Sequence, residues 1–233
     1  MINVDRIYQR VLTLANKEQR GYITPQEFNL LANHAQMDIF EQYFYDLNQF
    51  KRLSGNDTVH ADMVDILEEK ISIFEQTVPA NVTVVDNTIS LAALPNFYRL
   101  TTIAFQNIIY EHVTKKQFRL FQLSPLTEPT LRRPIYMIDR FDNIVSFAGR
   151  QDPVVDVEYI RTPAVVSWPY VVVGGKALFN ATAEDRQDFE LHPSEETELV
   201  MKILSLAGFT LKDPNLYQIA ASEDLKNTQQ EKQ

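Results

Sequence analysis

Three stretches in the first third of the chain repeat apolar residues at steps of three and four, which places them on one face of a helix. Thr24, Pro25 and Glu27 give the second stretch a strong start signal, because a threonine cap and a glutamate three residues later each satisfy a free backbone donor. Pro79 is expected to close the third stretch. We predict helices over residues 3–17, 25–50 and 61–77.

The second predicted helix carries more apolar surface than one packing partner would cover. A second stripe of Met37, Phe40 and Phe44 lies beside its main stripe at neighbouring angles. We therefore expect the main stripe to pack into the chain's own core and the second stripe to contact another subunit. The main stripe contains Phe28, Leu31, Ala35, Ile39, Tyr43, Leu47 and Phe50.

From residue 79 the pattern changes to the alternation of β-strands. Short runs rich in β-branched and aromatic residues are separated by dipeptides that favour hairpin turns. One short helix, capped by Thr114, interrupts these strands, and a helix with Pro193 near its start and Gly208 at its end follows them. The turn dipeptides are Asp86-Asn87, Gln106-Asn107, Asp142-Asn143 and Gly174-Gly175.

The order of these elements predicts an α+β fold, because terminal helices that enclose a run of strands form one helical layer with a β insertion. We assign residues 1–78 and 192–222 to a helical bundle of three N-terminal helices and a C-terminal helix. Residues 79–191 form an inserted antiparallel β-hairpin-rich subdomain with one short helix. Residues 223–233 have almost no apolar side chains, so we expect a flexible C-terminal arm that orders only against a neighbour.

Composition and charge narrow the possible functions. The chain has 31 acidic and 22 basic residues, and a net charge of −9 argues against general affinity for nucleic acid or anionic membranes. A wall past which DNA slides is also compatible with an acidic chain. No stretch is long and apolar enough to span a bilayer, and the first ten residues lack a leader pattern. We expect a protein made and used in a cytoplasm, or built into a particle there.

Few residues suggest catalysis or metal binding. The chain has no cysteine, which excludes disulfides, thiolate zinc sites and thiol nucleophiles. Gly21, Ile23 and Glu27 match three positions of an EF-hand calcium loop, but Arg20 stands where an oxygen ligand is needed, so we interpret this joint as a helix end and a helix cap. No two histidines are three or four residues apart, and we expect no catalytic, cofactor or metal site. The histidines are His34, His60, His112 and His192.

One stretch concentrates basic residues in this acidic chain. Lys115, Lys116 and Arg119 lie close together, and Arg132 and Arg133 follow. This cluster is suited to DNA phosphates or to the surface of an acidic partner, and exposure to solvent with no further role is an equal alternative.

Trp168 and Tyr170 are further candidates for a subunit interface. They lie in the string S-W-P-Y between two predicted strands, where an aromatic side chain beside proline often fills a partner's pocket. The alternative is that Trp168 seals the edge of the chain's own β subdomain.

Several strings resemble the head-to-tail connector proteins of tailed bacteriophages, the adaptor or ring proteins beneath the portal. The likeness is greatest to structural proteins of crAss-like and marine phages, and it spans nearly the whole chain. None of these strings is a catalytic motif. They are N-V-D-R-I-Y-Q-R-V-L-T-L-A-N-K-E-Q-R-G-Y-I-T-P-Q-E-F-N-L-L-A at 3–32, L-P-N-F-Y-R-L at 94–100, V-E-Y-I-R-T-P at 157–163 with Trp168 and Tyr170 after it, and S-E-E-T-E-L-V-M-K-I-L-S-L-A-G at 194–208.

The resemblance implies a virion structural protein that is not an enzyme and needs no cofactor. It implies a homo-oligomeric ring, commonly of twelve copies, that joins the portal protein to the tail or to further ring proteins while genomic DNA passes through its lumen. Two alternatives stay open: another neck or tail protein such as a tail fibre adaptor, and a phage-encoded hydrolase. A hydrolase requires a pocket where Glu, Asp and His side chains meet.

Overall fold

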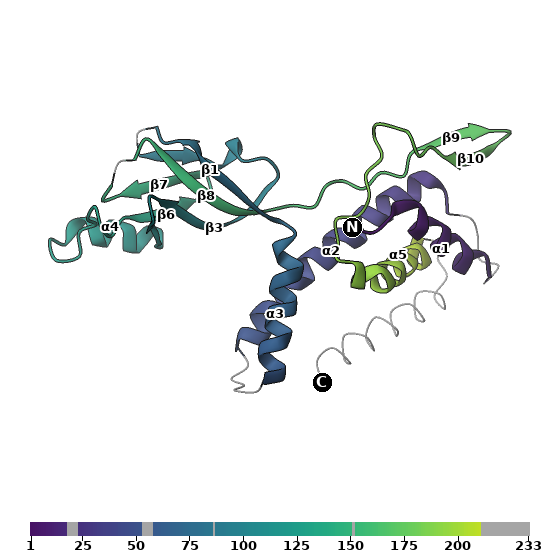
Figure 1. Cartoon of the computed structure of the whole chain (residues 1–233), viewed down its shortest axis with the longest axis horizontal. Coiled ribbons are helices and arrows are strands. Elements are labelled where there is room, and N and C mark those ends of the chain that lie inside the picture. Colours follow the sequence, from purple (N-terminus) through teal and green to yellow (C-terminus); the bar gives the residue numbers. More distant parts are fainter. Residues whose placement is uncertain (18–22, 53–57, 86, 151, 211–233) are drawn as a thin grey trace. The chain divides into compact units, whose positions relative to one another are not determined.

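The computed structural model describes residues 1–17, 23–52, 58–85, 87–150 and 152–210 (Figure 1). The chain forms two compact units. Unit 1 contains Met1–Ile73 and Pro163–Gln233, and unit 2 contains Phe74–Thr162. The predicted α+β class is confirmed. The predicted joint at Gly21 and the tail beyond residue 210 lie outside the described residues.

The described residues of unit 1 form four α-helices and a small hairpin. Helix α2 packs against α3 and α5, and α1 also packs against α5. The predicted helices are confirmed at these positions, although their ends differ. The elements are α1 (Val4–Lys17), α2 (Pro25–Arg52), α3 (Thr58–Ser72), β9 (Tyr170–Val173), β10 (Lys176–Phe179), the 3-10 turn η2 (Pro193–Glu195) and α5 (Glu196–Thr210).

The predicted capping box at the start of α2 is confirmed. The backbone N–H of Glu27 donates to Thr24 Oγ1 at 3.3 Å, and the backbone N–H of Thr24 donates to Glu27 Oε2 at 2.9 Å. These donors from Thr24 hold the pKa of Glu27 below its ordinary value, because they stabilise the carboxylate. Local chemistry therefore fixes where the longest helix begins.

Apart from residues 86 and 151, which are not described, unit 2 forms two four-stranded sheets, one 3-10 turn and one helix. The first sheet has the order β1-β8-β3-β4 and is antiparallel. The second has the order β2-β7-β6-β5, in which only the β5–β6 pair is parallel. The elements are β1 (Glu75–Thr83), β2 (Thr88–Ser90), η1 (Leu91–Ala93), β3 (Phe97–Phe105), β4 (Ile108–Ile109), β5 (Glu111–His112), α4 (Lys115–Leu123), β6 (Ile135–Asp139), β7 (Ile144–Ala148) and β8 (Val154–Arg161).

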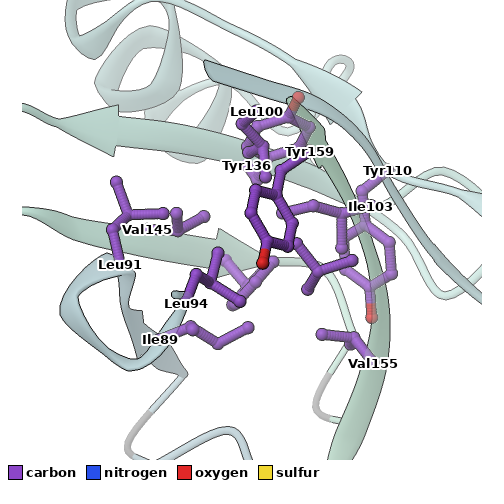
Figure 2. Packing of buried hydrophobic residues seen from close by; sticks show 12 residues of the cluster. Ile89, Leu91, Leu94, Leu100, Ile103, Tyr110, Tyr136, Val145, Val155 and Tyr159 are labelled. Carbon is purple, nitrogen blue, oxygen red and sulfur yellow. The ribbon is translucent and has the colours of Figure 1, made fainter. Parts of the chain in front are cut away.

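Side chains from both sheets form one apolar core in unit 2. Figure 2 shows Tyr159 of β8 in the middle of this cluster, with Leu94 and Ile103 near its ring. The Tyr159 hydroxyl donates to the backbone oxygen of Pro95 at 3.1 Å, so its polar end is satisfied at the core's margin. A second, smaller cluster of Val113, Phe118 and Ile135 fixes α4 to its sheet.

Turn chemistry determines three of the hairpins in the described residues, as predicted. Asn107 has a φ of 67° between β3 and β4, and Asn143 has a φ of 53° between β6 and β7. Gly174 has a φ of 60° between β9 and β10. These residues tolerate the left-handed conformation that tight hairpins require.

Three predicted boundaries are wrong: the end of the third helix, the start of the β subdomain, which is Phe74 and not residue 79, and the end of that subdomain. Helix α3 ends at Ser72 and β1 begins at Glu75, so residues 75–77 are strand and not helix. Pairing with β8, in which Glu75 lies opposite Ile160, overrides the local helical spacing. Pro79 lies within β1, where the register with β8 shifts, and an irregularity of this kind accommodates proline in a strand. Residues 163–191 belong to unit 1 and not to the β subdomain.

Candidate functional site

An extended segment at residues 163–168 is bound along α2 by amide side chains. Asn33 Oδ1 accepts from the backbone N–H of Val166 at 2.7 Å, and its Nδ2 donates to the Val166 oxygen at 2.9 Å. Asn29 bonds both backbone groups of Trp168 in the same way, at 2.9 and 3.4 Å. A strand advances about 6.6 Å in two residues and a helix about 5.4 Å in one turn, so amides one turn apart reach alternate residues of the segment.

Gln36 extends this amide ladder, which we define as Asn29, Asn33 and Gln36. Its Nε2 donates to the Ala164 oxygen at 2.8 Å, and its Oε1 accepts from the backbone N–H of Glu190 at 3.2 Å. The ladder explains why residues 163–168 belong to the helical unit. These three residues were not among the predicted site residues, although three amides at one-turn spacing on a helix were a signal for them.

Trp168 is not a surface residue, so the expectation that it lies at a subunit interface is wrong. Its side chain is 1% exposed, and its Nε1 donates to Asp5 Oδ1 at 2.9 Å. Its ring lies 4.3 Å from the ring of Tyr8 and stacks on that of Phe179 at 5.6 Å. Trp168 therefore belongs to the core of unit 1, because the amide ladder presses its backbone against α2.

The second stripe of α2 is only partly available to a partner. Phe40 is 0% exposed, so its assignment to an intersubunit face is wrong. It lies one turn beyond Gln36 on a face that the chain itself covers. Met37 and Phe44 are half-buried, and Tyr170 is half-buried where it accepts a hydrogen bond from Gln26 Nε2 at 3.3 Å. The surplus apolar surface inferred for α2 is therefore much smaller than its sequence indicates.

Exposed apolar side chains instead gather on the β9–β10 hairpin of unit 1. Val172 is 65% exposed, and Val171, Val173 and Leu178 are also open to solvent. Within the described chain these two strands pair only with each other, so both outer edges are free. A two-stranded ribbon with free edges and exposed valines is suited to protein contacts.

A second exposed surface lies on the segment 115–133 of unit 2, which includes α4. We call this segment the α4 arm. Leu123 is 79% exposed and Leu126 is 95% exposed, and Leu120 and Leu131 are also open. Exposed apolar side chains of this kind mark interaction sites, because covering them with a partner removes them from water and lowers the free energy.

The predicted basic cluster lies on this same arm. Lys115 forms an ion pair with Asp139 and lowers the pKa of that carboxyl, and Arg133 lies 3.3 Å from Glu111. Lys116, Arg119 and Arg132 are exposed, and no ion pair joins them to any described residue. The structure thus brings cations and exposed leucines together on one segment.

A buried ion pair ties α3 to the start of the C-terminal helix within unit 1. Lys70 Nζ lies 2.6 Å from Glu195 Oε1, and the side chains are 15% and 4% exposed. The ammonium also lies 5.7 Å from the ring centre of Tyr43. Buried charges that are paired in this way have a structural role, because separating them leaves an unsolvated ion.

Unit 2 has a groove of about 770 Å³ lined by Glu128, Arg150 and Asp152 among other residues. Asp152 is buried, and both of its oxygens are engaged: Oδ1 by Arg150 Nε at 2.7 Å and Oδ2 by the Tyr110 hydroxyl at 2.5 Å. Burial and this hydrogen bond raise the pKa of Tyr110 above its ordinary value. The trio links Tyr110, between β4 and β5, to the connection between β7 and β8.

Among the described ranges, no group of three or more His, Asp or Glu side chains is placed to hold a metal ion. The helices of the described part include none with the length and apolarity to cross a bilayer.

Comparisons with known proteins give no family for this chain. No protein-family model matches it, and no curated protein does so either.

Proposed function

We propose that the chain is a virion structural protein, the subunit of a head-to-tail adaptor ring between the portal and the tail of a bacteriophage. The resemblance of its sequence to such connectors supports this role. In this proposal the subunits enclose a channel for genomic DNA and bind the portal on one side and the tail on the other.

The observation that carries the proposal is the pair of exposed apolar surfaces, one in each unit. The α4 arm exposes Leu123 and Leu126, and the β9–β10 hairpin exposes Val172. A subunit in a ring needs at least two different contact surfaces, because each copy touches a neighbour on either side. Large exposed side chains on two separate elements meet this need.

The same two surfaces also fit another neck or tail protein, such as a tail fibre adaptor. The assignment to a ring between portal and tail rests on the sequence resemblance. The hydrolase alternative receives less support. Asp152 in the unit 2 groove accepts hydrogen bonds from Tyr110 and Arg150 on its two carboxylate oxygens. These bonds hold it in a structural role, so it is not poised to transfer a proton to a substrate.

Negative-stain imaging of the purified full chain over rising protein concentration tests the proposal. We expect closed rings with a central opening, and the particles should survive dilution better at low salt than at high salt. A monomer at every concentration and ionic strength would contradict the ring.

A further inference from the structure

The net charge of the protein is confined to one of its two units. Unit 2 contains nine acidic and nine basic residues, whereas unit 1 contains 22 acidic and 13 basic residues. The whole charge of −9 therefore resides on unit 1. Within unit 2, the stretch 111–133 has five basic and two acidic residues. A basic surface of one copy thus has an acidic unit available on every other copy.

Helix α4 presents one continuous outer face. Lys116, Arg119, Leu120 and Leu123 recur at steps of three, one and three, which places them together on one side of the helix. All four are exposed, whereas Phe118 on the inner side is buried. This outer face has cations toward the N-terminus and leucines toward the C-terminus. The helix dipole adds to its positive end.

Helix α3 presents the complementary face in unit 1. Asp65, Ile66 and Glu69 recur at steps of one and three and are exposed, with Ile66 at 45%. On its inner side Leu67 and Ile71 are buried. Neither Asp65 nor Glu69 forms an ion pair with any described residue. Glu69 lies in the last turn, where the negative end of the helix dipole adds to its charge.

In both helices a charge has the sign that its own dipole disfavours. Lys116 lies in the first turn of α4 and Glu69 in the last turn of α3. Each charge therefore weakens the helix that bears it slightly, but strengthens the potential that the helix end presents to a partner. The two ends are opposite in sign, and each offers an apolar side chain beside its charges.

We propose that the outer face of α4 in one copy docks on the outer face of α3 in the next copy. The contact pairs Lys116 and Arg119 with Asp65 and Glu69, and it covers Leu120 and Ile66. It is heterologous, so each copy has one of each face free for a further copy, and a closed ring or an open filament results. This inference rests on the proposed ring: it names the α3 face as the partner of the α4 arm between copies, and the β9–β10 hairpin stays exposed for a further contact.

The leucines decide between this partner and a nucleic acid. A phosphate backbone would satisfy Lys116 and Arg119 but would leave Leu120 and Leu123 without an apolar partner. The α3 face of a second copy satisfies both kinds of side chain.

Charge reversal tests the pairing. Lys116→Glu and Glu69→Lys should each weaken self-association by about tenfold or more, and the double variant should recover most of it. Both single substitutions put a favourable sign at a helix end, so the thermal midpoint should stay constant or rise. Arg99→Glu and Glu184→Lys, at exposed sites in the same two units, are controls with the same change in charge and should leave association within about twofold. Equal effects of variants and controls, or no recovery in the double variant, would overturn the pairing.

Cross-linking identifies the copies in contact, and the absence of native cysteine makes it clean. Leu120→Cys and Ile66→Cys proteins, mixed under oxidising conditions, should give a covalent heterodimer, whereas Leu14→Cys mixed with either should not. Two results would overturn the inference. One is a disulfide that forms only within a single chain carrying both substitutions, and the other is a Leu120→Cys homodimer that forms in preference to the heterodimer. Rings without the heterodimer overturn the inference alone, and a heterodimer without rings overturns the ring alone.

Discussion

The side chain of Asn33 in α2 binds both backbone polar groups of Val166: its Oδ1 accepts from the N–H at 2.7 Å, and its Nδ2 donates to the carbonyl oxygen at 2.9 Å. A helix here replaces the neighbouring strand that an extended segment normally needs. The same arrangement at Asn29 places Trp168 in the core of unit 1. The chain thus returns from unit 2 to unit 1 along a row of side-chain amides.

Removing this clamp should destabilise unit 1. Asn33→Ala leaves the N–H and C=O of Val166 without partners, so we expect a loss of about 1–3 kcal/mol in the free energy of unfolding. Urea denaturation followed by circular dichroism measures the loss. Asn48→Ala is the matched control, because Asn48 is an exposed asparagine on the same helix. Equal stabilities for the two variants would show that the amide ladder contributes nothing.

The position of Trp168 can be read from its fluorescence. It is the only tryptophan, so the emission of the native protein reports this site alone. Since its ring is enclosed by Tyr8, Tyr170 and Phe179, we expect blue-shifted emission and weak quenching by acrylamide. Emission typical of a tryptophan in water, with strong quenching in the unassembled chain, would contradict the burial of Trp168.

Local features of this fold were predictable from the sequence, and long-range ones were not. The cap at Thr24 and the turn at Asn143 depend on residues within three positions of each other, so the sequence displays them directly. Glu75 is a strand residue because it pairs with Ile160, and nothing near it in the chain indicates this.

The residues of the candidate interface were also predictable only where local sequence decides their surroundings. Apolar periodicity identified Phe40, and the string S-W-P-Y identified Trp168, as candidate interface residues, but both are buried. The place of Trp168 depends on Asn29, which lies more than a hundred positions away in the chain. The exposure of the cations on the α4 arm was predictable, because Lys116 and Arg119 are not among the apolar positions of the predicted helix. Their pairing with leucines on one face became visible only once the ends of α4 were known.

Removing one partner of the Lys70–Glu195 ion pair should lower the free energy of unfolding much more than replacing both partners. Lys70→Met leaves the buried carboxylate of Glu195 without its counter-ion, so we expect a loss of about 3–5 kcal/mol. Replacing both residues, as Lys70→Met with Glu195→Leu, should recover most of this loss. A double-mutant cycle in urea gives the coupling energy, and additive effects would exclude the pairing.

Tyr110 should make stability depend on pH in the alkaline range. Its pKa is raised by burial and by its bond to Asp152, so the folded protein keeps the phenol neutral when the unfolded chain ionises near pH 10. The stability contributed by this group is present below about pH 10 and is lost as pH rises further. The difference in unfolding free energy between the native chain and Tyr110→Phe should therefore shrink above that pH. A difference that stays constant there would contradict the raised pKa.

Sedimentation velocity of the full chain over a wide range of concentrations and salt shows whether its copies assemble through charged faces. We expect a monomer at high salt to give way at low salt to one discrete large species, with Lys116→Glu shifting this transition to higher protein concentration. A monomer under all conditions would contradict the ring, and an assembly that is indifferent to both salt and Lys116→Glu would contradict its formation through the α4 face.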